Sequence, residues 1–118
     1  MKTNVHYTMC DDLRNIIITY RDAILEDFPN AFIYLFGSIA KGGFKKSSDI
    51  DLLVILPNQT LDVKERKDAR ILIGCNRPLL DRDLDCKVYG EFDFNDLSNT
   101  SNFERCIKND LIDIGGWN

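Results

Sequence analysis

The chain has 118 residues, of which 44% are hydrophobic and 29% are charged, and its formal net charge at pH 7 is -4. These values are near those of globular domains and far from those of disordered or membrane chains. The acidic balance argues against an extended nucleic-acid surface, because proteins that grip long nucleic acids usually carry a basic face. We therefore expect a single domain over residues 1–118, for which a small anionic ligand that brings its own cations stays possible.

The four cysteines, at positions 10, 75, 86 and 106, form no Cys-x-x-Cys pair. Their spacing argues against a zinc knuckle or a disulfide framework and indicates a reducing compartment. The N-terminal segment MKTNVHYTMCDDL lacks the apolar core of a signal peptide, and no run approaches the roughly 18 apolar residues of a membrane span. We expect a cytoplasmic protein that makes no contact with a membrane.

Hydrophobic periodicity predicts the first elements. Between residues 11 and 28 apolar side chains recur at three- and four-residue steps, which is typical of an amphipathic helix. The run AFIYLF at 31–36 lies between a Pro-Asn turn and a glycine and predicts a buried strand. Residues 38–46 contain too many glycines for a long helix, so we expect one or two helical turns followed by a loop.

The second half of the chain continues this alternation. A strand is predicted over residues 49–56, where LLVIL suits a central position in a sheet, and a helix over residues 60–75. Residues 83–89 alternate between polar and apolar side chains, as a half-buried strand does. Residues 92–114 look helical in two pieces, with a cap expected within 98–101. Three strands interleaved with helices indicate an α/β fold with a small sheet.

Two aspartates interrupt the second predicted strand. Residues i and i+2 of a strand project to the same face, so the carboxylates of Asp49 and Asp51 are expected to point to one spot. Like charges that close repel each other unless a divalent cation lies between them, and hard oxygen ligands suit Mg²⁺. The alternative is that both side chains are solvated at the start of the strand.

A glycine-serine pair precedes these aspartates. Gly37 lies where the first predicted strand turns into a helical start, and without a Cβ it allows a bound group to approach the backbone. Ser38 supplies a hydroxyl at that helix N-terminus, where free N–H groups favour phosphate oxygens. Ser38 can instead be only an N-cap.

The segment FGSIAKGGFKKSSDIDLLVIL, residues 36–56, joins these pieces. A strand, Gly37-Ser38, ten residues, Asp49-Ile50-Asp51 and an apolar strand follow one another. This order resembles the signature of the polymerase-β-like nucleotidyltransferase superfamily, G-S, about ten residues and D-x-D, and most closely its minimal nucleotidyltransferase branch. The resemblance implies the fold of that superfamily, a small mixed sheet of at least three strands flanked by helices.

The family has a third metal-binding carboxylate on a neighbouring strand. In DLDCKVYG the candidate is Asp85, which an alternating run follows as the resemblance requires. Asp83 would lie on the same face and is the alternative. Both can instead be solvent-facing charges of an edge strand, although three aspartates at 81, 83 and 85 would concentrate negative charge without a cation.

The resemblance implies transfer of a nucleoside monophosphate, AMP from ATP in our interpretation, with release of pyrophosphate. By analogy, Asp49 and Asp51 bind two magnesium ions, while Asp85 binds the catalytic one and helps to deprotonate the attacking hydroxyl. Gly37 and Ser38 would hold the triphosphate. One ion would activate the nucleophile and the other would neutralise the leaving group.

Basic residues follow the glycine-serine pair, as expected for a triphosphate site. The family often has an arginine close to that pair, but here position 39 is Ile39 and the nearest base is Lys41. We take Lys41 as the candidate for a phosphate contact. Lys41, Lys45 and Lys46 can each steer the triphosphate or be merely solvated.

The acceptor of the nucleotide is expected to dock from outside, because the chain ends soon after its third predicted strand. Short members of this branch resemble antitoxins that add AMP to a tyrosine of a helical HEPN-domain toxin, so a HEPN-type partner protein is expected. Two alternatives stay open. One is a catalytically silent module that neutralises a partner by contact, and the other modifies a small molecule such as an aminoglycoside, with a homo-oligomer building the pocket.

Overall fold

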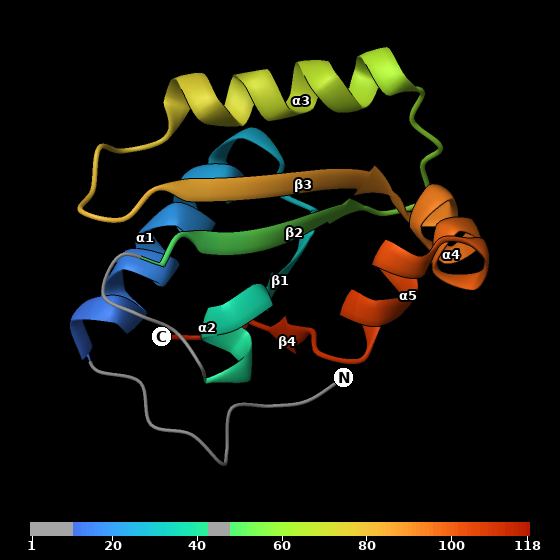
Figure 1. Cartoon of the computed structure of the whole chain (residues 1–118). Helices are drawn as coiled ribbons and strands as arrows, with labels where there is room; N and C mark the ends of the chain where they lie inside the picture. The colour runs from blue at the N-terminus through green and yellow to red at the C-terminus, as the bar shows by residue number, and fades with distance from the viewer. Residues whose placement is uncertain (1–10, 43–47) are drawn as a thin grey trace.

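The structure, a computed structural model, describes residues 11–42 and 48–118. Within these residues the chain alternates helices and strands, as Figure 1 shows. Lys45 and Lys46 lie outside the described residues. In chain order the elements are α1 (Asp11–Asp27), β1 (Phe32–Phe36), α2 (Gly37–Lys41), β2 (Ile50–Leu56), α3 (Val63–Asn76), β3 (Leu84–Gly90), α4 (Glu91–Thr100), α5 (Asn102–Lys108) and β4 (Ile112–Asp113).

The described strands form one mixed sheet in the order β3-β2-β1-β4. β2 runs parallel to β3 and antiparallel to β1, and β4 is antiparallel to β1. The central position predicted for the second strand is confirmed, and residues 52–56 are all buried. Because a hydrophobic cluster lies on each face of the sheet at β2, apolar side chains are required on both faces of this strand.

Helices cover the two faces of the sheet unequally. α1 and α3 cover one face, over the larger hydrophobic cluster. α4 and α5 pack on the other face, at the end toward which the arrowheads of β2 and β3 point in Figure 1. The starts of β2 and β3 therefore extend beyond these two helices. The core under α4 and α5 consists of Phe36, Leu53, Ile55, Tyr89, Phe94 and Leu111.

The C-terminal part differs from the sequence prediction. The expectation of helix through residue 114 is wrong, since Ile112–Asp113 forms β4 and pairs with Tyr34 and Leu35 of β1. Ile112 and Ile114 are buried on either side of exposed Asp113, which is a strand period of two that a helical reading overlooks. The free edge of β1 supplies the backbone partners that hold this segment.

Other boundaries shift by a few residues. The helix expected from residue 60 begins at Val63, because Asp62 forms a capping box with Glu65: the Asp62 side chain accepts from the Glu65 N–H, and the Glu65 side chain accepts from the Asp62 N–H. Asp49 and Asp83 each precede their strand by one residue. Within the part of the chain that the structure describes, no helix is long and apolar enough to cross a membrane.

Candidate functional site

Asp51 and Asp85 lie side by side near the starts of β2 and β3. The parallel register aligns Asp51 with Asp85, and the antiparallel register aligns Asp51 with Phe36 at the end of β1. Alternation along β2 places Asp51 on the same face as Leu53 and Ile55, which α4 and α5 cover farther along. The sheet itself thus brings together two carboxylates that are far apart in the sequence.

The electrostatics of the pair reflect this proximity. The pKa of Asp51 is raised to about 6 from its ordinary value near 3.8, first by burial and then by the negative charges of Asp85 and Asp49. A hydrogen bond with Asp85 raises this pKa further, whereas the positive charge of Lys87 lowers it. Two carboxyl groups that repel each other in a half-buried position form a place where an added cation is stabilised.

Gly37 lies directly against the Asp51 carboxylate. Its φ is +78°, a left-handed conformation that side chains rarely adopt, and a Cβ at this position would come within 2.1 Å of Asp51 Oδ2. The turn between β1 and α2 can therefore approach the acid pair only because residue 37 is glycine. This contact places the beginning of the Gly-Ser motif beside the carboxylates, although the two are separated in the sequence.

Ser38 and Lys41 lie on α2. The residue at the N-cap position of α2 is Phe36, so the interpretation of Ser38 as a mere N-cap is wrong. Ser38 is the second residue of the helix and is partly buried. Lys41 is well exposed, and its Nζ lies 3.7 Å from Oδ2 of Asp110. A phosphate-binding role for either residue stays a prediction.

The two remaining acidic candidates are more exposed. Asp49 precedes β2, is exposed, and acts on Asp51 through its charge. Asp83 precedes β3, and its Oδ1 lies 3.8 Å from Arg77 in an exposed ion pair. The choice between Asp83 and Asp85 stays a prediction, and the register opposite Asp51 favours Asp85.

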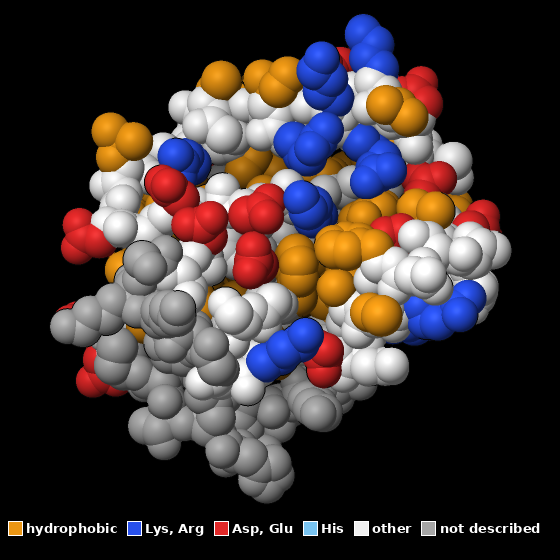
Figure 2. Space-filling model, viewed as in Figure 1, with side chains coloured by type: hydrophobic (Ala, Val, Ile, Leu, Met, Phe, Trp, Pro, Cys, Tyr) orange, Lys and Arg blue, Asp and Glu red, His pale blue; other side chains and the backbone are white. Residues whose placement is uncertain are grey.

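A lysine lies beside the two carboxylates of Asp51 and Asp85. Lys87, two residues after Asp85 on β3, places its Nζ 3.3 Å from Oδ1 of Asp85. Figure 2 shows acidic side chains gathered over the starts of β2 and β3, with basic side chains beside them on the side toward α3. Sequence reasoning assigned Lys87 no role, although its two-residue spacing from Asp85 already placed the two on one face.

Asp51 and Asp85 supply some, but not all, of the oxygen ligands that a magnesium ion requires. In residues 11–42 and 48–118, no group of three or more His, Cys, Asp or Glu side chains is arranged to hold a metal ion. Asp51 and Asp85 nevertheless offer hard carboxylate oxygens at one point. Mg²⁺ is commonly bound by one or two carboxylates together with substrate phosphates and waters. The pair therefore suits a magnesium ion that arrives with a phosphorylated ligand.

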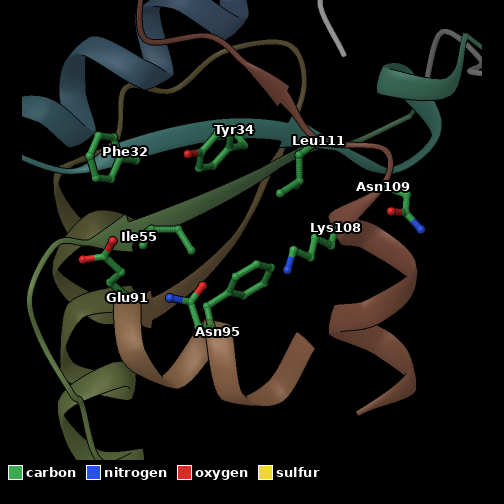
Figure 3. A pocket seen from close by; sticks show the side chains of 9 residues that line it. Phe32, Tyr34, Ile55, Glu91, Asn95, Lys108, Asn109 and Leu111 are labelled. Carbon is green, nitrogen blue, oxygen red and sulfur yellow. The ribbon is translucent and has the colours of Figure 1, made fainter. Parts of the chain in front are cut away.

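A separate pocket of about 470 Å³ lies under α4 and α5 on the same sheet face. In Figure 3, Phe32 and Tyr34 extend from β1 on one side, while Asn95 and Lys108 reach in from the two helices. Phe36 packs edge-to-face on Phe103 of α5, between this pocket and the acid pair. No sequence motif marked the pocket, because its lining comes from separate segments of the chain.

Comparison with known proteins identifies the family. A model of the nucleotidyltransferase domain matches residues 17–109. A proposed nucleotidyltransferase from Sulfolobus solfataricus, solved at 1.40 Å, is similar with a TM-score of 0.51 and 20% identity over 77% of this chain and 84% of that one. This likeness concerns the fold.

Two further similar chains come from toxin–antitoxin crystal structures. One, solved with AMP-PNP, has a TM-score of 0.39 and 26% identity over 79% of this chain and 78% of that one. The other, a mutant MntA–HpeT complex, has a TM-score of 0.36 and 32% identity over 64% of this chain and 55% of that one. No curated protein matches the chain. The match of the domain model to most of the sequence, on a mixed sheet flanked by helices, shows that the chain belongs to the nucleotidyltransferase domain family and has the polymerase-β-like fold.

Proposed function

We propose that this chain is a magnesium-dependent nucleotidyltransferase that moves AMP from ATP to a hydroxyl group on a partner protein. The observation that carries the proposal is the convergence of Asp51, Asp85 and the Gly37 turn at one point of the sheet. Each of these comes from a different strand or strand end. Two acids beside a glycine turn suit a phosphorylated substrate that brings a divalent cation.

The carboxylates would hold the metal. Asp51 and Asp85 are the proposed ligands, with exposed Asp49 as the third. A bound divalent ion supplies positive charge that polarises a phosphoryl group and neutralises a leaving group. Asp85, at the β3 side of the pair, is the proposed acceptor of the proton from the attacking hydroxyl.

The β1 side would hold the triphosphate. Gly37 brings the backbone of the turn against the Asp51 carboxylate, and Ser38 offers a hydroxyl donor on the next residue. Lys41 is exposed and can leave Asp110 for a phosphate oxygen, since exposed ion pairs are weak. In the sheet order β3-β2-β1 the acid pair then lies between the triphosphate and the acceptor hydroxyl.

A partner protein is the proposed acceptor, and a helical HEPN-type protein fits the motif resemblance. Exposed aromatic side chains near the α4 and α5 end offer contact area: Phe32 is 48%, Phe92 50% and Phe103 46% exposed. Exposed aromatic residues are common at protein interfaces. A partner that contacts this end would lie on the same face of the sheet as the acid pair.

The test uses the purified full chain, Mg²⁺, ATP labelled on its α-phosphate, and the protein encoded by the adjacent gene. We expect label to appear on the partner with the wild type and to be lost with Asp51→Asn. Absence of label with every nucleoside triphosphate, although the two proteins bind each other, would contradict the proposal.

A silent binding module is the second candidate, and one observation favours it. The described acidic side chains do not assemble a complete three-ligand set. This candidate predicts that an Asp51→Asn/Asp85→Asn double variant still neutralises the activity of the partner. If the double variant still binds the partner but no longer neutralises it, the result favours the enzyme over the silent module.

A further inference from the structure

Lys87 lies within ion-pairing distance of the acid pair. Its Nζ is 3.3 Å from Oδ1 of Asp85, and its side chain is only 34% exposed although a lysine on an edge strand can extend into water. Asp85 lies opposite Asp51 in the register of β2 and β3, and the charge of Lys87 acts on Asp51 as well, so the ammonium lies close to both carboxyl groups. The three side chains occupy one patch of the sheet face.

The neighbouring cations have other partners. Arg77 pairs with Asp83 at 3.8 Å, Lys41 pairs with Asp110 at 3.7 Å, and Arg82 donates from Nη1 to the carbonyl oxygen of Ser48 at 2.8 Å. In the described residues, Lys87 is thus the cation that the structure pairs with the acid pair itself.

We propose that Lys87 is a built-in counter-ion of the acid pair, which a divalent cation must displace from Asp85 in order to bind. The inference rests on the proposed metal site. The ammonium relieves part of the carboxylate repulsion in the metal-free protein, and it competes for the oxygen that the metal needs. Lys87 is therefore a positioning residue that weakens metal binding in the absence of nucleotide.

Mn²⁺ alone is the probe, because the electron paramagnetic resonance signal of the free ion reports its concentration without any catalysis. Titrations without nucleotide compare the wild type with Lys87→Met, Lys87→Arg and Lys64→Met. Lys64 is a matched control, since it is a lysine in an exposed ion pair with Asp68 on α3, and its loss changes the net charge equally.

We expect Lys87→Met to bind Mn²⁺ about two- to five-fold more tightly, the range for removal of a partly exposed ionic contact. Lys87→Arg keeps the positive charge and should bind Mn²⁺ with wild-type affinity. Lys64→Met should also bind Mn²⁺ as the wild type does. In an Asp85→Asn background, Lys87→Met should lose its effect, because the oxygen for which the two cations compete has changed. Unchanged or weaker binding by Lys87→Met would overturn the inference.

A second measurement on the wild type guards against a variant that fails to fold. Acetylation of lysines by a water-soluble reagent, read by peptide mass spectrometry, should label Lys87 faster when Mg²⁺ is present, while Lys64 labels at a constant rate. Equal labelling of Lys87 with and without Mg²⁺ contradicts displacement.

The outcomes separate the two proposals. If Mn²⁺ binds the wild type and Lys87→Met equally, the metal site stands and the role of Lys87 fails. If Mn²⁺ alone binds none of the proteins, the inference fails. The metal site of the proposed function then fails only if Mn²⁺ still does not bind the wild type in the presence of a non-hydrolysable ATP analogue.

Discussion

One face of the sheet carries charged side chains at the starts of β2 and β3 and buried apolar side chains farther along the same strands. At the start of β2, Asp51 faces Asp85 and the pair lies beyond the helices. Four residues later, Ile55 faces Tyr89 and is buried by α4 and α5. The two positions on β2 are about 13 Å apart at the usual rise of a strand.

The difference shows how one face can hold both charge and core. Carboxylates stay ionisable only where helices leave them partly open to water, and apolar side chains must be covered. The edge-to-face contact between Phe36 and Phe103 lies at the boundary. We call the Asp51 side the acid end and the Phe32 side the pocket end.

The largest effect is expected from removing a carboxylate of the acid end. Asp51→Asn or Asp85→Asn should lower the rate of nucleotide transfer by more than about 100-fold, because even residues behind metal ligands contribute ten- to a hundred-fold. Asp83→Asn is the matched control and should retain most of the activity, since Asp83 pairs with Arg77 instead. Steady-state kinetics with labelled ATP measure this. A larger loss with Asp83→Asn than with Asp85→Asn would reverse the assignment.

The contact of Gly37 with Asp51 gives the next effect. Gly37→Ala must place a methyl group against Asp51 Oδ2 and keep a positive φ, which destabilises the fold by about 1–3 kcal/mol and displaces the carboxylate. Gly74→Ala is the control, because that position lies in α3 and a Cβ there meets nothing within 4 Å. Urea unfolding measures both. A Gly37→Ala variant as stable as the wild type would show that the turn is not held against Asp51.

A smaller, pH-dependent effect follows from the raised pKa of Asp51. Its folded-state pKa of about 6 exceeds the ordinary 3.8, so the folded protein binds this proton more tightly than the unfolded chain. The ionised group therefore lowers stability as pH rises from about 4 to about 7. Without metal, Asp51→Asn should raise the melting temperature by about 2–5 °C at pH 7.5 and lose this advantage near pH 4.

Thermal unfolding in a chelator, followed by circular dichroism, checks the pH dependence. Saturating Mg²⁺ should raise the melting temperature of the wild type at pH 7.5 more than that of Asp51→Asn. A variant less stable than the wild type at pH 7.5 in chelator would contradict the electrostatic strain assigned to the pair.

The smallest effect is expected at the pocket end. Asn95→Ala, in the pocket of Figure 3, should leave Mn²⁺ affinity and the melting temperature nearly unchanged, because Asn95 is exposed and lies beyond the Phe36 boundary. Manganese titration and thermal unfolding compare it with the wild type. A change of more than about three-fold in metal affinity would show that the two ends are coupled.

The sequence predicted the parts of the fold that have a strong local pattern. The amphipathic stripe of α1 and the apolar run of β2 located these elements within one or two residues. β4 was missed because its period of two extends over only three residues, 112–114, and its pairing with Tyr34 and Leu35 is set by a strand far away in the sequence. Tertiary partners decide such short strands.

The candidate site, too, could be predicted from the sequence only in part. The Gly-Ser and Asp-x-Asp spacing predicted Gly37 and Asp51 as candidates, but their direct contact depends on the register of β1 against β2. Lys87 was overlooked because a lysine in an alternating strand looks like an ordinary solvated residue. The two-residue spacing placed Lys87 on the same face as Asp85, but the 3.3 Å contact between Nζ and Oδ1 of Asp85 is visible only in the folded strand.

Anomalous diffraction from crystals soaked in Mn²⁺ and a non-hydrolysable ATP analogue would locate the metal ion in the acid end. We expect a manganese peak within coordination distance of carboxylate oxygens of both Asp51 and Asp85, with the triphosphate against the Gly37 turn. Bound nucleotide with no manganese peak between those two side chains would contradict it.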